Sequence, residues 1–507
     1  MMTNLASIIR GVLEVDPAAS ELEYNEKWLN WGDLERRAVA LDEVLNDLGL
    51  GAGARVGVML RNRPEMVSVL LAVFMSERCL ATLNAGAPAD KLAEDVRKVA
   101  APVILGLPED WEKPGILEAA RENGAFCIEL NLDSVRIIAT GSRLRWTNSE
   151  APGIAIEMLS SGTTGTPKRI PLKARNFEKA LMGAASYEKG RSLDDAPKLR
   201  RGVQIVTAPL AHIAGITGVM NNILAGRRIC LIDKFDVEAF RSAIVRHGPK
   251  VAGAPPSALR MILDADVPKK DLSSLVAFRT GTAPLDPDLA DEFYNKYGIP
   301  VLQNYGATEF AGGVAGWTLE DFKAHWGNKR GSVGRLNSGA EAHTVDPETG
   351  AVLPSGETGL LAVRAPNIGD GITWVRTTDI ARVDEDRFVW ILGRHDNAII
   401  RGGFKILPDD LVRILEQYPD VREATVIGVP DRRLGQVPVA AVIRRTGKDL
   451  SIDKLMEFLR KNLMNYQVPV RIIELKEFPR TPSMKVSQPA LQALFENAEE
   501  GREHAGG

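Results

Sequence analysis

The first third of the chain alternates short apolar runs with longer segments in which apolar residues recur every three or four positions. This helical spacing extends from Asp33 to Leu48, with Asp33 as the expected N-cap and Gly49 as the expected stop. Beyond it we expect strands at 55–60, 79–83 and 102–105 and helices at 66–75 and 91–99. Strands that alternate with helices predict a largely parallel sheet covered on both faces.

The same alternation returns between Val203 and Val301, so we predict two α/β sheets in the first two thirds of the chain. The expected strands of this second group are Val203–Val206, Arg228–Ile232 and Val251–Ala252. From Gly331 to Gly393 the pattern changes to short alternating strands separated by turns rich in Gly, Pro and Asp. This pattern predicts a small antiparallel β element.

The pattern changes again after Arg394, where helices and strands alternate over the length of an ordinary small domain. We expect helices at Leu411–Gln417 and Lys454–Leu463 and strands at Ala424–Val429 and Val437–Ile443. The sequence therefore predicts an α/β protein with a large N-terminal domain, residues 1–394, made of two α/β sheet subdomains and a small β element. A small, mobile α+β C-terminal domain, residues 395–507, is expected to follow it.

The composition is that of a soluble globular protein, since 45% of the 507 residues are hydrophobic and 25% are charged. The formal net charge of −3 leaves no excess positive charge to neutralise a phosphate backbone, so nucleic acid is not an expected partner. Cys79, Cys127 and Cys230 lie far apart and in no CxxC or Cys/His ligand spacing. This fits a reducing compartment, argues against a zinc site and predicts that each cysteine is a small buried hydrophobe.

The chain shows no pattern of a secretion signal or a membrane span. The first ten residues lack a basic stretch that leads into an apolar core. The longest apolar stretch, Met66 to Met75, falls short of the roughly 18 to 20 residues that cross a bilayer, so we expect a buried helix there. We predict a cytoplasmic protein without a transmembrane segment.

The sharpest local pattern is a run of hydroxyls and glycines behind the apolar strand Ile154–Leu159. Glycines let successive backbone N–H groups converge on an anion, hydroxyls add donors and a lysine adds positive charge, so the run predicts a phosphate-binding loop. It is not the P-loop of the nucleoside triphosphatases, because Pro167 interrupts that pattern. Standing alone, such a run is more often a flexible polar loop. The residues expected to bind phosphate are Ser160, Ser161, Gly162, Thr163, Thr164, Gly165, Thr166 and Lys168.

Four further segments, together with this loop, resemble the signatures of a known family. They are Gln303–Glu309, Thr378–Asp379, Gly393–Asp396 and Pro482–Val486. In order and spacing the five segments resemble the adenylate-forming superfamily, which contains acyl-CoA synthetases, luciferases and peptide-synthetase adenylation domains. The resemblance extends from about Trp31 to Val486, and the layout is most similar to that of acyl-CoA synthetases.

The resemblance implies a binding site for ATP and Mg²⁺. Tyr305 would offer a flat face to adenine, Asp379 would accept both ribose hydroxyls, and Arg394 would reach ribose or phosphate. Glu309 and Thr164 would hold Mg²⁺, for which a carboxylate is a hard oxygen ligand. The other residues that the resemblance assigns to the nucleotide site are Gly281, Thr282, Ala283, Asn304, Gly306, Ala307 and Thr308.

The resemblance also implies that the two domains share the chemistry. His212 would lie at the carboxylate end of the acyl pocket, although a lone histidine among apolar neighbours is more often a satisfied core residue. Lys485 would bridge the attacking carboxylate and the α-phosphate, two anions that must meet. The C-terminal domain would then swing about the hinge Asp396, withdraw Lys485 and present Gly402–Gly403 to the pantetheine arm of CoA. The alternative for these two glycines is a plain hairpin turn. The expected catalytic residues are Lys485, Glu309, Thr164 and His212.

Met484 and Thr378 stand where the family has glycine, which predicts a stiffer lysine loop and an altered lid geometry. The leading prediction is an ATP-dependent acid–CoA ligase that uses ATP, Mg²⁺ and CoA on a small carboxylic acid. One alternative is an enzyme that stops at acyl-AMP or passes the acyl group to a carrier protein. A second is a nucleotide-binding protein that has lost catalysis, and luciferase chemistry on the same scaffold also stays open.

Overall fold

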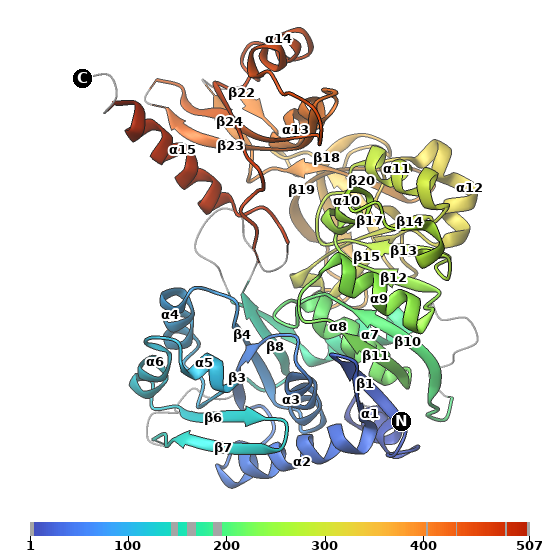
Figure 1. Ribbon diagram of the computed structural model, residues 1–507, viewed down its shortest axis with the longest axis vertical. Coiled ribbons are helices and arrows are strands. Elements are labelled where there is room, and N and C mark those ends of the chain that lie inside the picture. The colour runs from blue at the N-terminus through green and yellow to red at the C-terminus, as the bar shows by residue number, and fades with distance from the viewer. Residues whose placement is uncertain are drawn as a thin grey trace.

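The computed structural model describes residues 5–142, 151–159, 169–185, 195–401, 404–431, 433–481 and 484–503. A large N-terminal body carries a smaller C-terminal domain, drawn in orange and red at the top of Figure 1. The described strands form four sheets of seven, four, nine and five strands. The predicted fold class, a large α/β N-terminal domain followed by a small C-terminal domain, is confirmed.

The seven-stranded sheet contains the first elements predicted from the sequence. Its strands are β3 Arg55–Leu60, β4 Cys79–Asn84, β5 Val103–Gly106, β6 Phe126–Asn131, β7 Ser134–Ala139, β8 Ile154–Leu159 and β9 Arg169–Lys173. Its helices are α2 Trp31–Asp47, α3 Pro64–Met75, α4 Ala89–Val99, α5 Pro108–Trp111 and α6 Ile116–Glu122. The order is β7-β6-β5-β3-β4-β8-β9, parallel in the centre and antiparallel at both edges. Val58 packs with α2 and α3 on one face, and Met59 packs with α4 and α6 on the other, as predicted for a doubly covered sheet.

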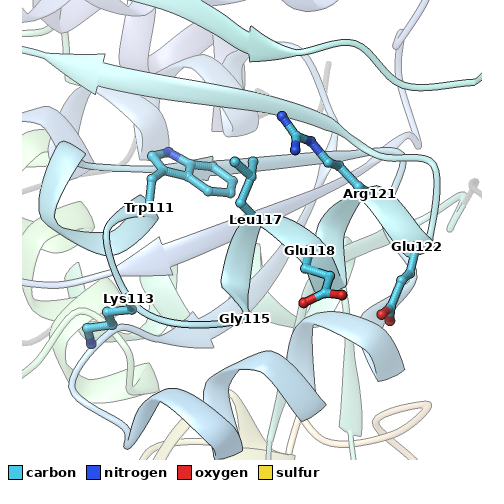
Figure 2. Close-up of a pocket in the computed structure, with 7 residues that line it drawn as sticks. All are labelled: Trp111, Lys113, Gly115, Leu117, Glu118, Arg121 and Glu122. Carbon is cyan, nitrogen blue, oxygen red and sulfur yellow. The ribbon is translucent and has the colours of Figure 1, made fainter.

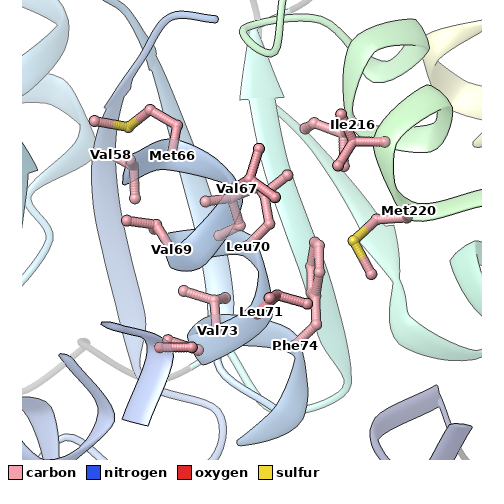
Figure 3. Packing of buried hydrophobic residues seen from close by; sticks show 14 of the residues in the cluster. Val58, Met66, Val67, Val69, Leu70, Leu71, Val73, Phe74, Ile216 and Met220 are labelled. Carbon is pink, nitrogen blue, oxygen red and sulfur yellow. The ribbon is translucent and has the colours of Figure 1, made fainter. Parts of the chain in front are cut away.

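Helix α3 is the most deeply buried helix of this body, and every residue from Met66 to Met75 is buried. Figure 3 shows it between β3, which contributes Val58, and α8 (Ile213–Leu224), which contributes Ile216 and Met220. Each of these large apolar side chains contributes about 1.5 to 3 kcal/mol by leaving water. Within the described part of the chain, neither this helix nor any other has the length and apolar character to cross a membrane.

The four-stranded sheet differs from the prediction for the second α/β group. It contains β1 Ser20–Tyr24, β2 Lys27–Asn30, β10 Arg200–Val206 and β11 Arg227–Leu231 in the order β10-β11-β1-β2. Strand β11 takes the N-terminal hairpin as its partner, with Leu22 opposite Ile229 in a parallel ladder. The group between Val203 and Val301 therefore does not form one sheet. Helices α8 and α9 Val237–His247 contact this sheet, and α1 Leu5–Leu13 and α7 Ala174–Ala185 contact α8.

The remaining strands of that group continue into the predicted β element. Three parallel strands, β12 Val251–Gly253, β13 Ala277–Thr280 and β14 Val301–Ala307, lead into antiparallel strands β15 Gly312–Gly316, β16 Gly334–Leu336, β17 Glu341–Val345, β18 Thr358–Arg364, β19 Val375–Val383 and β20 Phe388–Arg394. The order is β12-β13-β14-β15-β16-β20-β19-β18-β17, so β20 lies in the interior of the sheet. The helices here are α10 Pro256–Asp264, α11 Pro287–Tyr297, α12 Leu319–Lys329 and the short 3-10 turns Lys269–Leu272 and Thr308–Phe310.

The C-terminal domain is the predicted α+β unit. Its strands are β21 Ile399–Arg401, β22 Phe404–Ile406, β23 Val421–Asp431, β24 Gly435–Arg444 and β25 Arg471–Glu474, and its helices are α13 Pro408–Glu416, α14 Ile452–Asn462 and α15 Gln488–Glu503. Val426 packs toward α13 and α14, whereas Ile427 packs toward α15, so helices cover both faces of this sheet as well. Arg422 of β23 forms an ion pair with Asp264 of α10, with 3.1 Å between Nη1 and Oδ2, which joins the two domains.

Asn30, not Asp33, is the N-cap of α2, so that prediction was wrong. The Asn30 side chain accepts a hydrogen bond from the Asp33 N–H at 2.7 Å, and the Asp33 carboxylate accepts one from the Asn30 N–H at 3.0 Å. This reciprocal capping box places Asp33 in the first turn, where its negative charge faces the positive end of the helix dipole.

The three cysteines are buried, as predicted. Cys230 belongs to a polar group that its spacing along the chain does not reveal, because Cys230, Glu23 and His247 place their polar atoms within 4.8 Å of one another. The Glu23 carboxylate already faces the Arg246 guanidinium at 2.6 Å and the His247 Nε2 at 2.5 Å. The group is therefore an internally paired polar cluster between β1, β11 and α9.

Candidate active site

The segments expected around adenine meet where β13 and β14 approach each other. A Cβ on Gly281 would come within 1.9 Å of the Asn304 Oδ1 and 3.1 Å of the Asn304 carbonyl oxygen, so a side chain here would displace the Asn304 amide. A Cβ on Gly306 would likewise lie 2.3 Å from the Gly312 carbonyl oxygen of β15. The structure therefore brings together the two predicted segments, which contain Gly281, Thr282 and Ala283 on one side and Asn304, Tyr305, Gly306, Ala307 and Thr308 on the other.

Tyr305 and Asp379 form the centre of this region, although they lie 74 positions apart in the chain. The Tyr305 hydroxyl donates a hydrogen bond to the Asp379 Oδ2. Burial raises the pKa of Tyr305, and the negative charge of Asp379 raises it further, so the phenol stays protonated. Burial also raises the pKa of Asp379, an effect that the Tyr305 hydrogen bond and the charge of Arg394 oppose.

Arg394 lies opposite Asp379 in the ladder between β19 and β20. Its Nε and Nη2 donate to the two carboxylate oxygens of Asp396 at 2.8 and 2.5 Å. Nη2 also donates to the Thr378 Oγ1 at 2.8 Å. Thr378 thus supplies a hydroxyl that the glycine of the family pattern lacks, and the guanidinium is held next to the predicted hinge residue.

Lys485 reaches this site from the C-terminal domain. In Figure 1 the segment between β25 and α15, drawn in red, extends toward the N-terminal body. Burial lowers the pKa of the Lys485 ammonium, the charge of Arg394 lowers it further, and the charge of Glu309 opposes both effects. The lysine therefore lies close enough to Arg394 and Glu309 to interact with them electrostatically.

His212 is the N-cap residue of α8 and lies close enough to Lys485 for the lysine charge to act on it. Burial lowers its pKa to about 4, and the positive charge of Lys485 contributes to this shift. Its Nε2 is buried and has no hydrogen-bond partner among the residues that the structure describes. A neutral imidazole with an unused nitrogen can bind a carboxyl group, so the geometry does not support the alternative of a satisfied core histidine.

The titration of His212 is open to direct measurement. In protein with ¹³C-labelled histidine, the NMR signal of His212 can be assigned by its loss in His212→Gln. We expect this signal to titrate near pH 4. Lys485→Ala should raise the pKa of His212, because a nearby positive charge is removed. Since the folded-state pKa lies below the unfolded value of about 6.5, the unfolded chain takes up the proton first and the fold loses stability as pH falls from about 6.5 toward 4. A His212 pKa near 6.5 in the wild-type protein, or a His212 pKa that does not change in Lys485→Ala, would contradict this arrangement.

Glu309 follows β14 in the 3-10 turn Thr308–Phe310 and is exposed. The Glu309 carboxylate faces solvent and lies near the charges of Lys485 and Arg394. Its oxygens are hard ligands of the kind that Mg²⁺ prefers, so the residue fits this cation. The second expected ligand, Thr164, lies outside the described residues, as does the whole phosphate loop Ser160–Lys168. The flanking strands β8 and β9 are antiparallel partners, with Leu159 opposite Arg169, so that loop begins and ends at adjacent positions of one sheet.

A family model described as "AMP-binding enzyme" matches residues 12–373, and one described as "AMP-binding enzyme C-terminal domain" matches residues 413–485. The first match alone covers more than half of the chain. The chain belongs to the AMP-binding enzyme family. The resemblance found in the sequence is thereby confirmed.

Curated relatives of this AMP-binding enzyme include three proteins named as CoA ligases or as similar to them. The 4-coumarate–CoA ligase-like 9 of Arabidopsis thaliana is 31% identical over 66% of this chain and 61% of its own length. The peroxisomal OPC-8:0-CoA ligase 1 of the same plant is 29% identical, with 90% of this chain and 87% of the relative covered. The 2-succinylbenzoate–CoA ligase of Bacillus cereus is 26% identical, with 96% and 98% covered.

Among solved structures, the fold matches MatB of Rhodopseudomonas palustris, which is 24% identical and covers 98% of this chain. The TM-score is 0.82 with the ATP-bound crystal structure and 0.69 with the apo crystal structure, and all of the MatB chain is covered in both. The likeness to both crystal structures shows that this AMP-binding enzyme has the same fold.

One buried polar residue near the site is not among the residues predicted from the sequence. Asn62, only 2% exposed, donates to the carbonyl oxygens of Ala208 at 3.2 Å and Ile232 at 2.9 Å and accepts from the Leu210 N–H at 2.8 Å. It therefore holds the segment that leads to His212. In the sequence, Asn62 is marked only as a polar residue between two apolar elements, and this pattern does not predict its hydrogen-bond partners.

Figure 2 shows a separate surface pocket around α6, at the outer edge of the first sheet. Its lining consists of Trp111, Lys113, Gly115, Leu117, Glu118, Arg121 and Glu122. None of the predicted site residues lines it. The charged side chains of both signs and the open shape give it no convergent set of polar groups, so the candidate active site is the region around Tyr305, Asp379 and Lys485.

Also outside the described residues are Gly402 and Gly403, which were assigned to CoA. The strands on either side of them, β21 and β22, pair antiparallel with Arg401 opposite Phe404. The role of Gly402 and Gly403 toward CoA stays a prediction.

Proposed function

We propose that the protein is an ATP-dependent, AMP-forming acid–CoA ligase. It would activate a carboxylic acid as acyl-adenylate with release of pyrophosphate and then transfer the acyl group to the thiol of CoA. The observation that carries this proposal is the position of Lys485, brought by the C-terminal domain to Arg394, Glu309 and His212. The CoA-ligase relatives confirm the reaction class predicted from the sequence.

In the first half-reaction the carboxylate oxygen attacks the α-phosphorus, and the bond to pyrophosphate breaks. Two anions must approach while negative charge grows on the phosphoryl oxygens, so catalysis consists mainly of positioning and charge neutralisation. Lys485 would lie between the carboxylate and the α-phosphate. His212, neutral and with a free Nε2, would orient the carboxylate from the other side.

The nucleotide would be held by the N-terminal domain alone. Tyr305 would stack on adenine, and Asp379 would accept the ribose hydroxyls in place of its present bond with the Tyr305 hydroxyl. Arg394 would reach the ribose or phosphate from its position beside Thr378. The loop Ser160–Lys168 would bind the phosphates, and Gly281–Ala283, Asn304 and Gly306–Thr308 would line the adenine site.

Glu309, together with Thr164, would hold Mg²⁺. The ion, when bound, would neutralise charge on the phosphates of ATP. Glu309 suits this role because its carboxylate is exposed and lies near the site of the reacting phosphate.

The second half-reaction would need a different domain arrangement, because the CoA thiol must reach the acyl carbon from the space that Lys485 occupies. We place the domain boundary between residues 394 and 395, at the end of β20, with Asp396 as the hinge and Gly402–Gly403 at the CoA face. The gap between the two family matches, residues 374–412, spans this boundary and supports it. A cytoplasmic location and a carrier protein as an alternative acceptor remain predictions.

A panel of carboxylic acids tests the proposal. We expect ATP-dependent pyrophosphate release with at least one of 4-coumarate, 2-succinylbenzoate, aliphatic acids of increasing length and dicarboxylic acids, and formation of the acyl-CoA when CoA is added. Accumulation of acyl-AMP without thioester in the presence of CoA would instead favour transfer to a carrier protein. Failure to bind or turn over ATP with every acid would contradict the proposed function.

A further inference from the structure

The loop that carries Lys485 is held in place by a side chain that has no part in the proposed chemistry. Arg480 lies five residues before the lysine, and its Nη1 donates to the Met484 carbonyl oxygen at 3.0 Å. Its Nη2 donates to the Glu423 carboxylate of β23. Arg480 also forms an isolated antiparallel bridge with Val486, so its backbone and its side chain both bind the same loop.

The loop needs such support because of its backbone conformation. Met484 has a φ of +63°, in the left-handed region where a side chain costs energy. A conformation of this kind persists only where its surroundings fix it. The Met484 N–H donates to the Thr481 carbonyl at 2.9 Å, and the charge-assisted bond from Arg480 holds the carbonyl on the other side of the same residue. Both peptide groups of Met484 are therefore fixed immediately before Lys485.

The anchor of Arg480 adjoins the contact between the domains. Glu423 follows Arg422, which pairs with Asp264 of the N-terminal domain at 3.1 Å. The ladder between β23 and β24 shifts register between Val421 and Glu423. Next to this irregularity the strand contacts the N-terminal domain through Arg422 and the lysine loop through Glu423. The side chains of Arg480 and Glu423 are only 22% and 26% exposed, so water screens this pair less than a surface pair.

We propose that Arg480, anchored by Glu423, is a positioning residue for Lys485 in the adenylation half-reaction. It fixes the loop relative to β23, so that docking of β23 on α10 also brings the ammonium to the reacting anions. Arg480 itself touches no reactant. This inference rests on the proposed function through the role of Lys485. It adds that the first half-reaction requires Arg480 to hold the lysine loop, whereas the second half-reaction does not.

The test compares the two half-reactions in the full-length protein, with the acid from the panel that gives the fastest pyrophosphate release. Arg480→Met keeps the apolar stem but removes both hydrogen bonds. It should slow adenylation by about ten- to a hundredfold, while KM for ATP and thioester formation from synthetic acyl-AMP stay within about twofold. Arg480→Lys, which retains the charge but not the planar fork, should recover part of the adenylation rate. Arg444→Met is the matched control, because it breaks a more exposed pair with Glu474 in the same domain.

The outcomes separate this inference from the proposed function. If Arg480→Met adenylates at the wild-type rate, or loses both half-reactions equally, Arg480 is not a positioning residue for the first one. If Lys485→Ala loses adenylation in the same assay, the proposed function stands in either case. If Lys485→Ala adenylates normally, the role of the lysine fails, and the inference fails with it. Should Arg480→Met not fold, Glu423→Gln removes only the anchoring charge and must give the same selective loss.

Discussion

Replacing Lys485 by alanine should reduce acyl-AMP formation by a factor on the order of 10² to 10³, the range for losing one preorganised group that stabilises charge in a transition state. The lysine is the group that the C-terminal domain brings to the site, and Arg394 is engaged by Asp396 and Thr378. Thioester formation from preformed acyl-AMP should persist, because that step involves no attack on phosphorus. Pyrophosphate exchange measures the first half-reaction, and acyl-CoA production from synthetic acyl-AMP measures the second.

Lys476→Ala is the matched control for this substitution. Lys476 is an exposed lysine of the same domain, so its loss changes the net charge equally but should leave both half-reactions intact. Ordinary ATP-dependent activity in Lys485→Ala would show that another group bridges the carboxylate and the phosphate.

Replacing Asp396 by proline should block the second half-reaction by freezing the hinge. Proline fixes its own φ and restricts the residue before it, so the turn between β20 and β21 loses the freedom that a domain rotation needs. Since the structure holds Lys485 at the site, we expect the variant to release pyrophosphate and accumulate acyl-AMP. Thioester formation should fall tenfold or more, roughly the scale of a conformational step made rate-limiting. The measurement is acyl-CoA formation from supplied acyl-AMP.

Asp396→Ala separates the hinge from the ion pair. It removes the carboxylate that binds Arg394 but leaves the backbone free. If alanine and proline give the same loss, the Arg394 contact and not the hinge is responsible. Full retention of both half-reactions in Asp396→Pro would place the hinge elsewhere.

The segments that the sequence predicts best are those whose burial follows a local period. Helix α3 was expected at 66–75 and extends from Pro64 to Met75, because apolar side chains packed on all sides leave a continuous run in the sequence. The pairing of β11 with β1 was not predicted. Residues 22 and 229 lie far apart in the sequence and become neighbours only in the tertiary fold. The sequence of a single strand does not predict which other strand it pairs with.

For the site, the family resemblance supplied the residue types but not their contacts. Three hydrogen bonds depend on side-chain rotamers and tertiary contacts that the sequence does not show. They join Tyr305 to Asp379, Arg394 to Thr378, and Arg480 to the Met484 carbonyl oxygen. The sequence marked Met484 as a departure from glycine. The positive φ found there explains why the family prefers glycine at that position.

The position of β20 has a consequence for the fate of the intermediate. This strand ends at Arg394, and inside the nine-stranded sheet it is bonded to β16 on one edge and to β19 on the other. In the proposed rotation of the C-terminal domain, neither this strand nor Tyr305 and Asp379 in the same sheet could follow that domain. The acyl-adenylate is a mixed anhydride that water would hydrolyse. It could therefore stay bound at the same residues of the nine-stranded sheet while Lys485 leaves and the CoA-binding face of the C-terminal domain replaces it.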